Sequence, residues 1–329
     1  MTDNNTNEEV LKSKSDFTSE IEDENVNKRV VDSDWDGPSP KPKPKVGGSA
    51  DGGNEETGDI NEIKITVSDQ RTPVIILFGA RNSGKTMTLI RLTRYLKANE
   101  YKVLPVETFR EGDKYKKLCK EYSSICNRDL AADSTSIFNF MLLNVIDKFG
   151  HSVCQLLEAP GEHYFDPDHP DRDYLRYLHQ ITSLPNKRVW MIIVELGWGG
   201  GKQELRNNYK DRVIAIPSVD KNVAKDKFIF MCNKIDMHPE LIPGGNINEK
   251  EVFEKILGEY PGIFAPFKNK IPILNWFKKY NFQFVPFSAG TFPPIETGAN
   301  KGKRTYVQGS DEYPIMLWNA ILKAIGKKM

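Results

Sequence analysis

The chain has 329 residues, of which 39% are hydrophobic and 28% are charged, as is ordinary for a soluble globular protein. Its formal net charge of +1 gives no overall electrostatic reason to expect nucleic acid or a membrane surface as a partner. We expect no membrane span and no lipid anchor, because no apolar run reaches the roughly 18 residues of a spanning helix and no lipidation motif occurs.

Residues 1–58 differ in composition from the rest of the chain. They are rich in Asp, Glu, Asn, Ser and Gly, contain the run "PSPKPKPK", and hold few large apolar side chains. Such a segment cannot bury enough apolar surface to offset the entropy that is lost on ordering. The sequence therefore predicts a disordered acidic tail with a Pro-Lys stretch over residues 1–58, and one domain with insertions over residues 59–329.

The first part of the domain combines strand patterns with helix patterns. Alternation in "EIKITV" predicts a short strand, and the continuous apolar run "PVIILFGA" over residues 73–80 predicts a buried parallel strand. Leucines at helical spacing predict a helix over residues 83–98, and residues 109–130 form a polar helical stretch. Residues 138–158 predict two strands that are joined by a turn.

The second part continues the alternation. Three apolar runs predict strands: "RVWMIIVEL", "KFIFMCN" and "FQFVPFS". Helices are predicted after the glycine-rich loop "GWGGGK", over "NEKEVFEKILGEY", and over "PIMLWNAILKAIG", whereas "VIAIPSV" fits either a strand or a buried helix end. Strands that alternate with helices favour an α/β fold with a mostly parallel sheet, here with one antiparallel hairpin.

The segment "GARNSGKT", residues 79–86, fits the phosphate-loop pattern G-x-x-x-x-G-K-[ST] and lies between a predicted buried strand and a predicted helix. Glycines such as Gly79 and Gly84 let the backbone approach phosphate groups. The backbone N–H groups of the loop, including those of Asn82 and Ser83, can then point at the anion together with the helix N-terminus.

Two side chains complete the loop. Lys85 can reach the β- and γ-phosphates of a nucleotide, and the hydroxyl of Thr86 can bind Mg²⁺. The complete pattern in this context predicts the three-layer fold of P-loop NTPases.

The segment "NKID", residues 233–236, predicts the base. It follows a buried strand, so its side chains belong at the carboxyl edge of the sheet, where ligands of α/β proteins bind. The carboxylate of Asp236 can accept hydrogen bonds from N1–H and the exocyclic amine of guanine, and adenine has neither donor there. Asn233 belongs to the same base-binding segment, and the stem of Lys234 can cover one face of the base.

With these segments in view, the chain from about Pro73 onward resembles the P-loop GTPases of the Ras-like and translation-factor class. "GARNSGKT", "EAPG", "NKID" and "FSAG" are similar to the first, third, fourth and fifth motifs of that family, in the family's order. The resemblance implies GTP and GDP as ligands, with Mg²⁺. It also implies that Gly161 senses the γ-phosphate through its backbone N–H, and that Ser288 and Ala289 support the guanine.

The same resemblance implies a metal site. Thr86 and Glu158 would hold Mg²⁺, and the second motif would add a threonine, for which we choose Thr135 over its neighbours Ser134 and Ser136. The family normally has Asp at the position of Glu158, and the longer arm could displace the bridging water, bind the metal directly, or fit poorly.

The residues that follow Gly161 are the candidates for catalysis. The family places a water-orienting residue there, and this chain has Glu162 and then His163. Glu162 could orient or deprotonate water but would repel a γ-phosphate, and His163 could act if the loop is shifted by one residue. Arg81, inside the phosphate loop, is one candidate for a charge-stabilising arginine, and the alternative is an ordinary surface arginine.

These features lead to two competing predictions. The first is a slow, Mg²⁺-dependent GTPase that acts as a molecular switch. The second is a GTP-binding scaffold with little or no hydrolysis, whose insertions and tail recruit an unidentified protein partner or effector. A P-loop ATPase or kinase is a third possibility, which "NKID" opposes. The four cysteines lack a metal-binding spacing, and no apolar signal region occurs, so we expect reduced thiols and a cytoplasmic location.

Overall fold

Mostly apolar segments, with many β-branched and aromatic residues, build a seven-stranded sheet in the described part of the chain. The computed structural model describes residues 63–127, 140–218, 226–269, 280–297 and 303–327, which all belong to one unit, Ala50–Met329. The predicted tail and its boundary with the domain lie outside the described residues.

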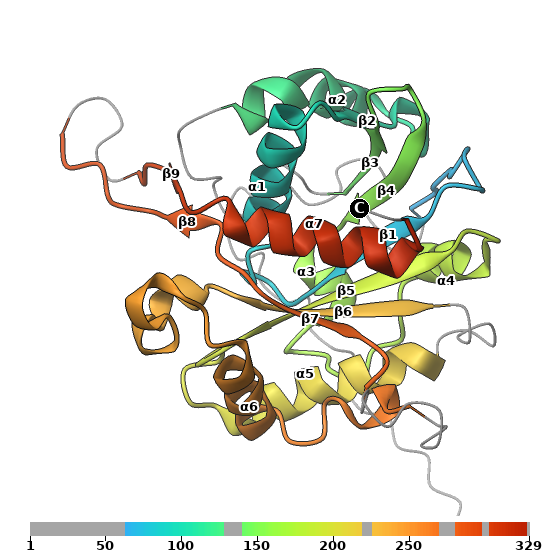
Figure 1. Ribbon diagram of the computed structural model, residues 1–329. Helices are drawn as coiled ribbons and strands as arrows, with labels where there is room; N and C mark the ends of the chain where they lie inside the picture. The colour runs from blue at the N-terminus through green and yellow to red at the C-terminus, as the bar shows by residue number, and fades with distance from the viewer. Residues whose placement is uncertain (1–62, 128–139, 219–225, 270–279, 298–302, 328–329) are drawn as a thin grey trace, which may run out of the picture. The chain divides into compact units, whose positions relative to one another are not determined.

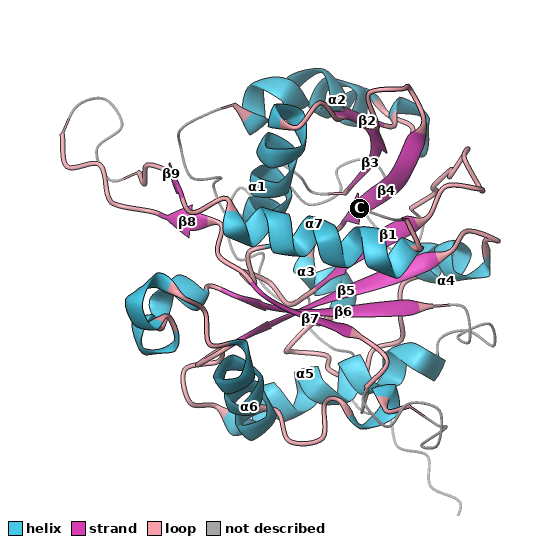
Figure 2. Cartoon of the chain, in the orientation of Figure 1, coloured by secondary structure: helices cyan, strands magenta, loops and turns pink. Residues whose placement is uncertain are grey.

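The strands of this sheet are β1 (Val74–Phe78), β2 (Lys102–Pro105), β3 (Met141–Ile146), β4 (Ser152–Glu158), β5 (Arg188–Glu195), β6 (Lys227–Asn233) and β7 (Gln283–Pro286). They lie side by side in the order β2-β3-β4-β1-β5-β6-β7 (Figure 2). The strands β4, β1, β5, β6 and β7 are parallel, whereas β3 runs antiparallel to both of its neighbours. A separate antiparallel pair is formed by β8 (Gly290–Thr291) and β9 (Val307–Gln308).

Helices cover both faces of the sheet. They are α1 (Lys85–Ala98), α2 (Asp113–Cys126), α3 (Gly161–Tyr164), α4 (Arg176–Ser183), α5 (Gln203–Ala215), α6 (Glu249–Glu259) and α7 (Glu312–Ile325). α1 and α7 lie on one face, and α5 and α6 lie on the other (Figure 1). α2 packs beside α1, where the hydroxyl groups of Thr93 and Tyr122 are 2.8 Å apart. None of the helices in the described ranges is both long and apolar enough to cross a membrane.

The central strand explains why the core reaches the functional edge. All five residues of β1 are buried, as expected for a strand with neighbours on both sides and helices on both faces. Its last residue, Phe78, contacts the rings of Tyr164, Trp190 and Tyr209 from three other elements. The loop that leaves β1 is therefore anchored on a rigid base.

The structure confirms the predicted α/β class, the mostly parallel sheet and the antiparallel hairpin, which is β3 and β4. The strand predicted for "EIKITV" is wrong, because residues 63–67 form no strand. Ile63 and Val67 are buried, so the alternation reflects packing against the core, and the N–H of Thr66 bonds to the carbonyl of Phe109 at 2.9 Å. Residues 213–218 of "VIAIPSV" form the end of α5 and a 3₁₀ turn, Ile216–Ser218.

Candidate functional site

The parallel strands bring the sequence motifs to one edge of the sheet. β1, β4, β6 and β7 all end at that edge, and each is followed by a motif segment. Because parallel strands share their carboxyl edge, four segments from distant parts of the sequence become neighbours.

The first segment forms a tight loop between β1 and α1. Gly84 precedes α1 with φ 84°, a left-handed conformation that a residue with a side chain rarely adopts, and Asn82 also has a positive φ of 61°. Left-handed residues turn successive N–H groups toward one point, and the N-terminus of a 14-residue helix lies behind them. The loop therefore has the geometry of an anion site.

Lys85 lies inside this loop rather than in solvent. Its side chain is buried, and Nζ donates to the carbonyl oxygens of Gly79 at 3.0 Å and Ala80 at 2.9 Å. Burial lowers the pKa of the ammonium group, and the carboxylates of Glu158 and Glu162 oppose that shift. An ammonium has three N–H donors, so one remains for a phosphate oxygen.

Thr86 and Glu158 meet at the start of α1. The Thr86 hydroxyl donates to Oε1 of Glu158 at 2.5 Å, and Oε2 is buried without a hydrogen-bond partner among the described residues. Burial raises the pKa of Glu158, whereas Thr86 and Lys85 lower it.

An unpaired buried carboxylate oxygen beside a hydroxyl is a donor set that fits Mg²⁺, which prefers oxygen ligands. The side chains of Glu158 and Thr86 therefore fit a Mg²⁺ ion. No group of three or more His, Cys, Asp or Glu side chains that could hold a metal occurs in the ranges described, so a metal here would need phosphate and water oxygens as well. Thr135, Ser134 and Ser136 lie outside the described residues.

Gly161 packs directly on the phosphate loop. A Cβ atom built on Gly161 would lie 2.3 Å from the backbone nitrogen of Arg81 and 2.5 Å from the carbonyl carbon of Ala80. Real Cβ atoms do not approach backbone so closely, so only glycine allows the third motif to touch the first.

The two candidate catalytic residues have different surroundings. Glu162 is partly exposed, and its Oε1 lies 3.2 Å from Nε of Arg81 in the phosphate loop. His163 is buried, and its Nδ1 lies 3.0 Å from the hydroxyl of Tyr177. Burial lowers the pKa of His163 to about 3, helped by the positive charges of Arg172 and Arg110.

The segment "NKID", residues 233–236, is hydrogen-bonded to the phosphate loop. Nδ2 of the buried Asn233 donates to the carbonyl oxygen of Ser83 at 2.8 Å, and its Oδ1 has no partner among the described residues. Lys234 follows in a left-handed conformation with φ 58°, and its Nζ pairs with Glu195 at 2.8 Å. The phosphate loop and the predicted base segment are thus one connected unit.

The segment "FSAG", residues 287–290, lies beside the segment "NKID". The N–H of Ile235 donates to the carbonyl of Phe287 at 3.2 Å, and Asp236 is exposed in the 3₁₀ turn Ile235–Met237. Ser288 and Ala289 are buried, and the Ser288 hydroxyl accepts the N–H of Gly290 at 3.1 Å. Asp236 therefore presents an exposed carboxylate at the edge that carries the phosphate loop.

Sequence analysis did not identify one residue of the site. Glu195 ends β5 between the motif strands, and it fixes the end of the Lys234 side chain. The signal was present, because "RVWMIIVE" ends in a carboxylate as "LLE" does at Glu158.

Comparisons with known proteins find similarity among solved structures alone. No family model matches the chain, and no curated protein matches it. Among solved structures, the Ski7 GTPase-like domain of S. cerevisiae bound to GDP and inorganic phosphate is similar, with 17% identity and a TM-score of 0.40 over 78% of this chain and 50% of that chain. The GTP-bound form of that domain gives 17% identity and a TM-score of 0.38 over 76% and 50%. This chain thus spans about half the length of those structures.

Proposed function

We propose that this chain is a GTP-binding protein, a slow Mg²⁺-dependent GTPase that acts as a molecular switch. The observation that carries the proposal is the direct contact between motif segments from distant parts of the sequence. Gly161 touches the phosphate loop at Arg81, and Asn233 bonds to it at Ser83. Contacts of this kind support a phosphate site, a γ-phosphate sensor and a base site that lie next to one another.

The residues have separate roles in this proposal. The loop N–H groups and Lys85 bind the phosphates, and the backbone N–H of Gly161 meets the γ-phosphate. Asp236 accepts from the guanine edge, with Lys234 against one face of the base. Glu158 and Thr86 would hold Mg²⁺, and Thr135 remains the predicted third ligand. The metal would neutralise charge on the phosphate oxygens.

Two observations support slow turnover. Glu162 stands beside the phosphate loop, where a second negative charge opposes an approaching γ-phosphate, although Arg81 offsets part of that repulsion. His163 is buried against the rings of Phe140 and Tyr177, and its Nδ1 lies 3.0 Å from the Tyr177 hydroxyl. The same observations favour the alternative function, a GTP-binding scaffold that recruits protein partners and scarcely hydrolyses.

Binding of GTP and ATP to the purified full chain, followed by single-turnover hydrolysis, tests both functions. A GTPase binds GTP in preference to ATP, requires Mg²⁺ and releases phosphate when enzyme is in excess. Equal affinity for ATP would contradict the base assignment, and tight GTP binding without phosphate release would favour the scaffold. A Lys85→Ala variant with unchanged GTP affinity would contradict the phosphate-loop assignment.

A further inference from the structure

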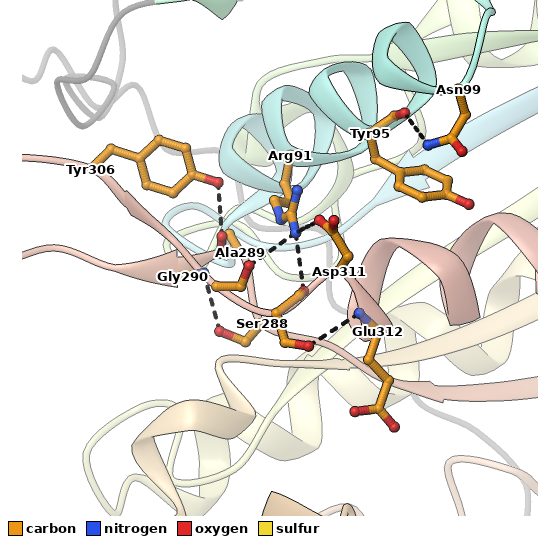
Figure 3. Close-up of polar contacts among 11 residues, drawn as sticks. Arg91, Tyr95, Asn99, Ser288, Ala289, Gly290, Tyr306, Asp311 and Glu312 are labelled. Atoms are coloured by element: carbon orange, nitrogen blue, oxygen red, sulfur yellow. Dashed lines mark hydrogen bonds and ion pairs between the residues drawn. The ribbon is translucent and has the colours of Figure 1, made fainter.

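A fully buried arginine joins the phosphate-binding helix to the segment behind the fifth motif. Arg91 lies on α1, and its Nη2 donates to the carbonyl oxygens of Gly309 and Ser310, each at 3.0 Å, and to Oδ1 of Asp311 at 2.6 Å (Figure 3). Its side chain is 0% exposed, although Asp311 is 68% exposed. These three acceptors connect β9 to α7, and all of them converge on one nitrogen.

The segment that Arg91 holds also holds the fifth motif. The N–H of Gly309 donates to the carbonyl of Ala289 at 3.5 Å, and the hydroxyl of Tyr306 donates to the same oxygen at 2.8 Å (Figure 3). Arg94, one turn after Arg91, lies over the ring of Tyr306 at 4.8 Å. A chain of contacts thus runs from α1 through Arg91 and Gly309 to Ala289.

The bonding of Arg91 is costly if its only purpose is stability. Its Nε and Nη1 are buried and have no hydrogen-bond partner among the described residues, and an unpaired buried N–H costs about 1–3 kcal/mol. An apolar side chain would avoid that cost at this position. What an apolar side chain cannot supply is a fixed distance between α1 and the backbone at Gly309–Asp311.

We propose that Arg91 is a positioning residue for base recognition. It sets the place of Ser288 and Ala289 relative to the phosphate loop, because α1 begins at that loop and Arg91 fixes the backbone behind Ala289. The guanine site around Asp236 then has the correct spacing from the phosphates. This inference rests on the proposed GTP-binding function and deepens it, since it names a residue that holds the base site in position.

The test compares Arg91→Met and Arg91→Lys in the full chain. Affinities for Mg²⁺-GTP, Mg²⁺-ITP and Mg²⁺-ATP are measured by calorimetry, with thermal melting beside them. Arg91→Met is expected to reduce the preference for GTP over ATP by about tenfold, which corresponds to about 1.4 kcal/mol, while ATP affinity stays within about threefold. Arg91→Lys is expected to retain most of the preference, because one ammonium carries three N–H donors to the same three acceptors.

Arg188→Met is the matched control. Arg188 is also a buried arginine, paired with Asp226 at 2.9 Å, but it begins β5 at the opposite edge of the sheet. Its loss is expected to lower the melting temperature and leave the GTP preference unchanged.

The outcomes separate the inference from the proposed function. A wild-type chain without GTP preference refutes the proposed function before any variant is tested. If the wild type prefers GTP and Arg91→Met keeps that preference, or if Arg188→Met loses as much of it, Arg91 is merely structural and the inference fails. Should Arg91→Met not fold, Asp311→Ala serves instead, because alanine removes the Oδ1 acceptor, and an unchanged preference in that variant would overturn the inference.

Discussion

His163 shows how strongly the surroundings of one residue depend on chain regions far from it. The sequence places it two positions after Gly161, as a candidate for orienting water. In the folded chain it lies against Phe140 and bonds to Tyr177, and burial holds its pKa at about 3. Neither partner could be foreseen from the local sequence, because one precedes β3 and the other lies on α4. Its catalytic role remains a prediction.

The pKa of His163 has a consequence for stability. An ordinary histidine has a pKa near 6.5 in the unfolded chain, so between pH 6.5 and 3 the unfolded state binds the extra proton. The contribution of neutral His163 is therefore present above pH 6.5 and is lost as the pH falls. From pH 7.5 to 5 we expect the free energy of unfolding to drop by about 2 kcal/mol more in the wild type than in His163→Gln.

Urea denaturation at the two pH values measures this drop. The exposed His179 supplies the control, because His179→Gln is expected to keep the wild-type pH dependence. Equal pH dependence of the wild type and His163→Gln would contradict the buried, neutral state of His163.

Gly161 allows a second test at the residue scale. A methyl group at this position would meet the backbone of the phosphate loop at 2.3 Å, and backbone cannot move aside as a flexible side chain can. We expect Gly161→Ala to lower the free energy of unfolding of the nucleotide-free chain by about 1–3 kcal/mol. Gly258 lies exposed in α6 with open space around it, so Gly258→Ala should stabilise slightly. A Gly161→Ala variant as stable as the wild type would refute the contact.

A substitution at Asp236 tests which base the site binds. Xanthine carries a carbonyl where guanine carries its exocyclic amine, so an amide donor suits xanthine and a carboxylate suits guanine. Asp236→Asn is expected to lose at least about tenfold in GTP affinity and to gain a comparable factor for XTP. Competition binding of the two nucleotides measures the exchange, and an unchanged ranking would place the base elsewhere.

At the scale of elements, the segment that follows the third motif is held by two arginines from later in the chain. Nη2 of Arg172 donates to the carbonyl of Glu162, and Nε of Arg212, on α5, donates to the carbonyl of Tyr164 at 2.9 Å. α3 is only four residues long, so these external bonds, with that of His163 to Tyr177, supply much of its order.

Removal of one of these bonds should loosen α3 alone. We expect Arg172→Met to raise hydrogen exchange of the amides of residues 161–165 by about tenfold, because local opening no longer has to break that bond. GDP affinity should stay within about threefold, since GDP lacks the γ-phosphate that Gly161 would meet. Arg176, exposed at the start of α4, gives the control variant Arg176→Met. Unchanged exchange in Arg172→Met would mean that α3 is ordered without this arginine.

The helices and strands were predicted correctly where the sequence has a long continuous apolar run. The continuous apolar runs inside β1, β5 and β6 were found with nearly correct ends. β2 has only four residues, and its half-exposed pattern around Val103 carries no strand signal; it forms because β3 offers a free edge. α4 was missed because "DPDHPDRDY" before it looks like an uninterrupted loop. Tertiary pairing decided these cases, and it is not visible in local sequence.

At the scale of the whole molecule, nucleotide binding should increase the free energy of unfolding. A ligand that binds only the folded state at 100 times its dissociation constant adds about 2.7 kcal/mol to the free energy of unfolding. For a domain of this size we expect Mg²⁺-GTP to raise the melting temperature by roughly 5–10 °C. ATP at the same concentration should raise it far less, and Lys85→Ala should abolish the effect. Equal shifts with GTP and ATP would argue against guanine recognition.

The hydrogen bond between Asn233 and Ser83 has a consequence for how the chain is made. Its two ends are 150 residues apart, so the phosphate loop leaves the ribosome long before the residue that secures it. At about 5–20 residues per second, that interval lasts roughly 8–30 seconds. During synthesis the nascent chain therefore carries the phosphate-loop segment without the segment at Asn233, and under the proposed function it would reach its full nucleotide affinity only after β6 has entered the sheet.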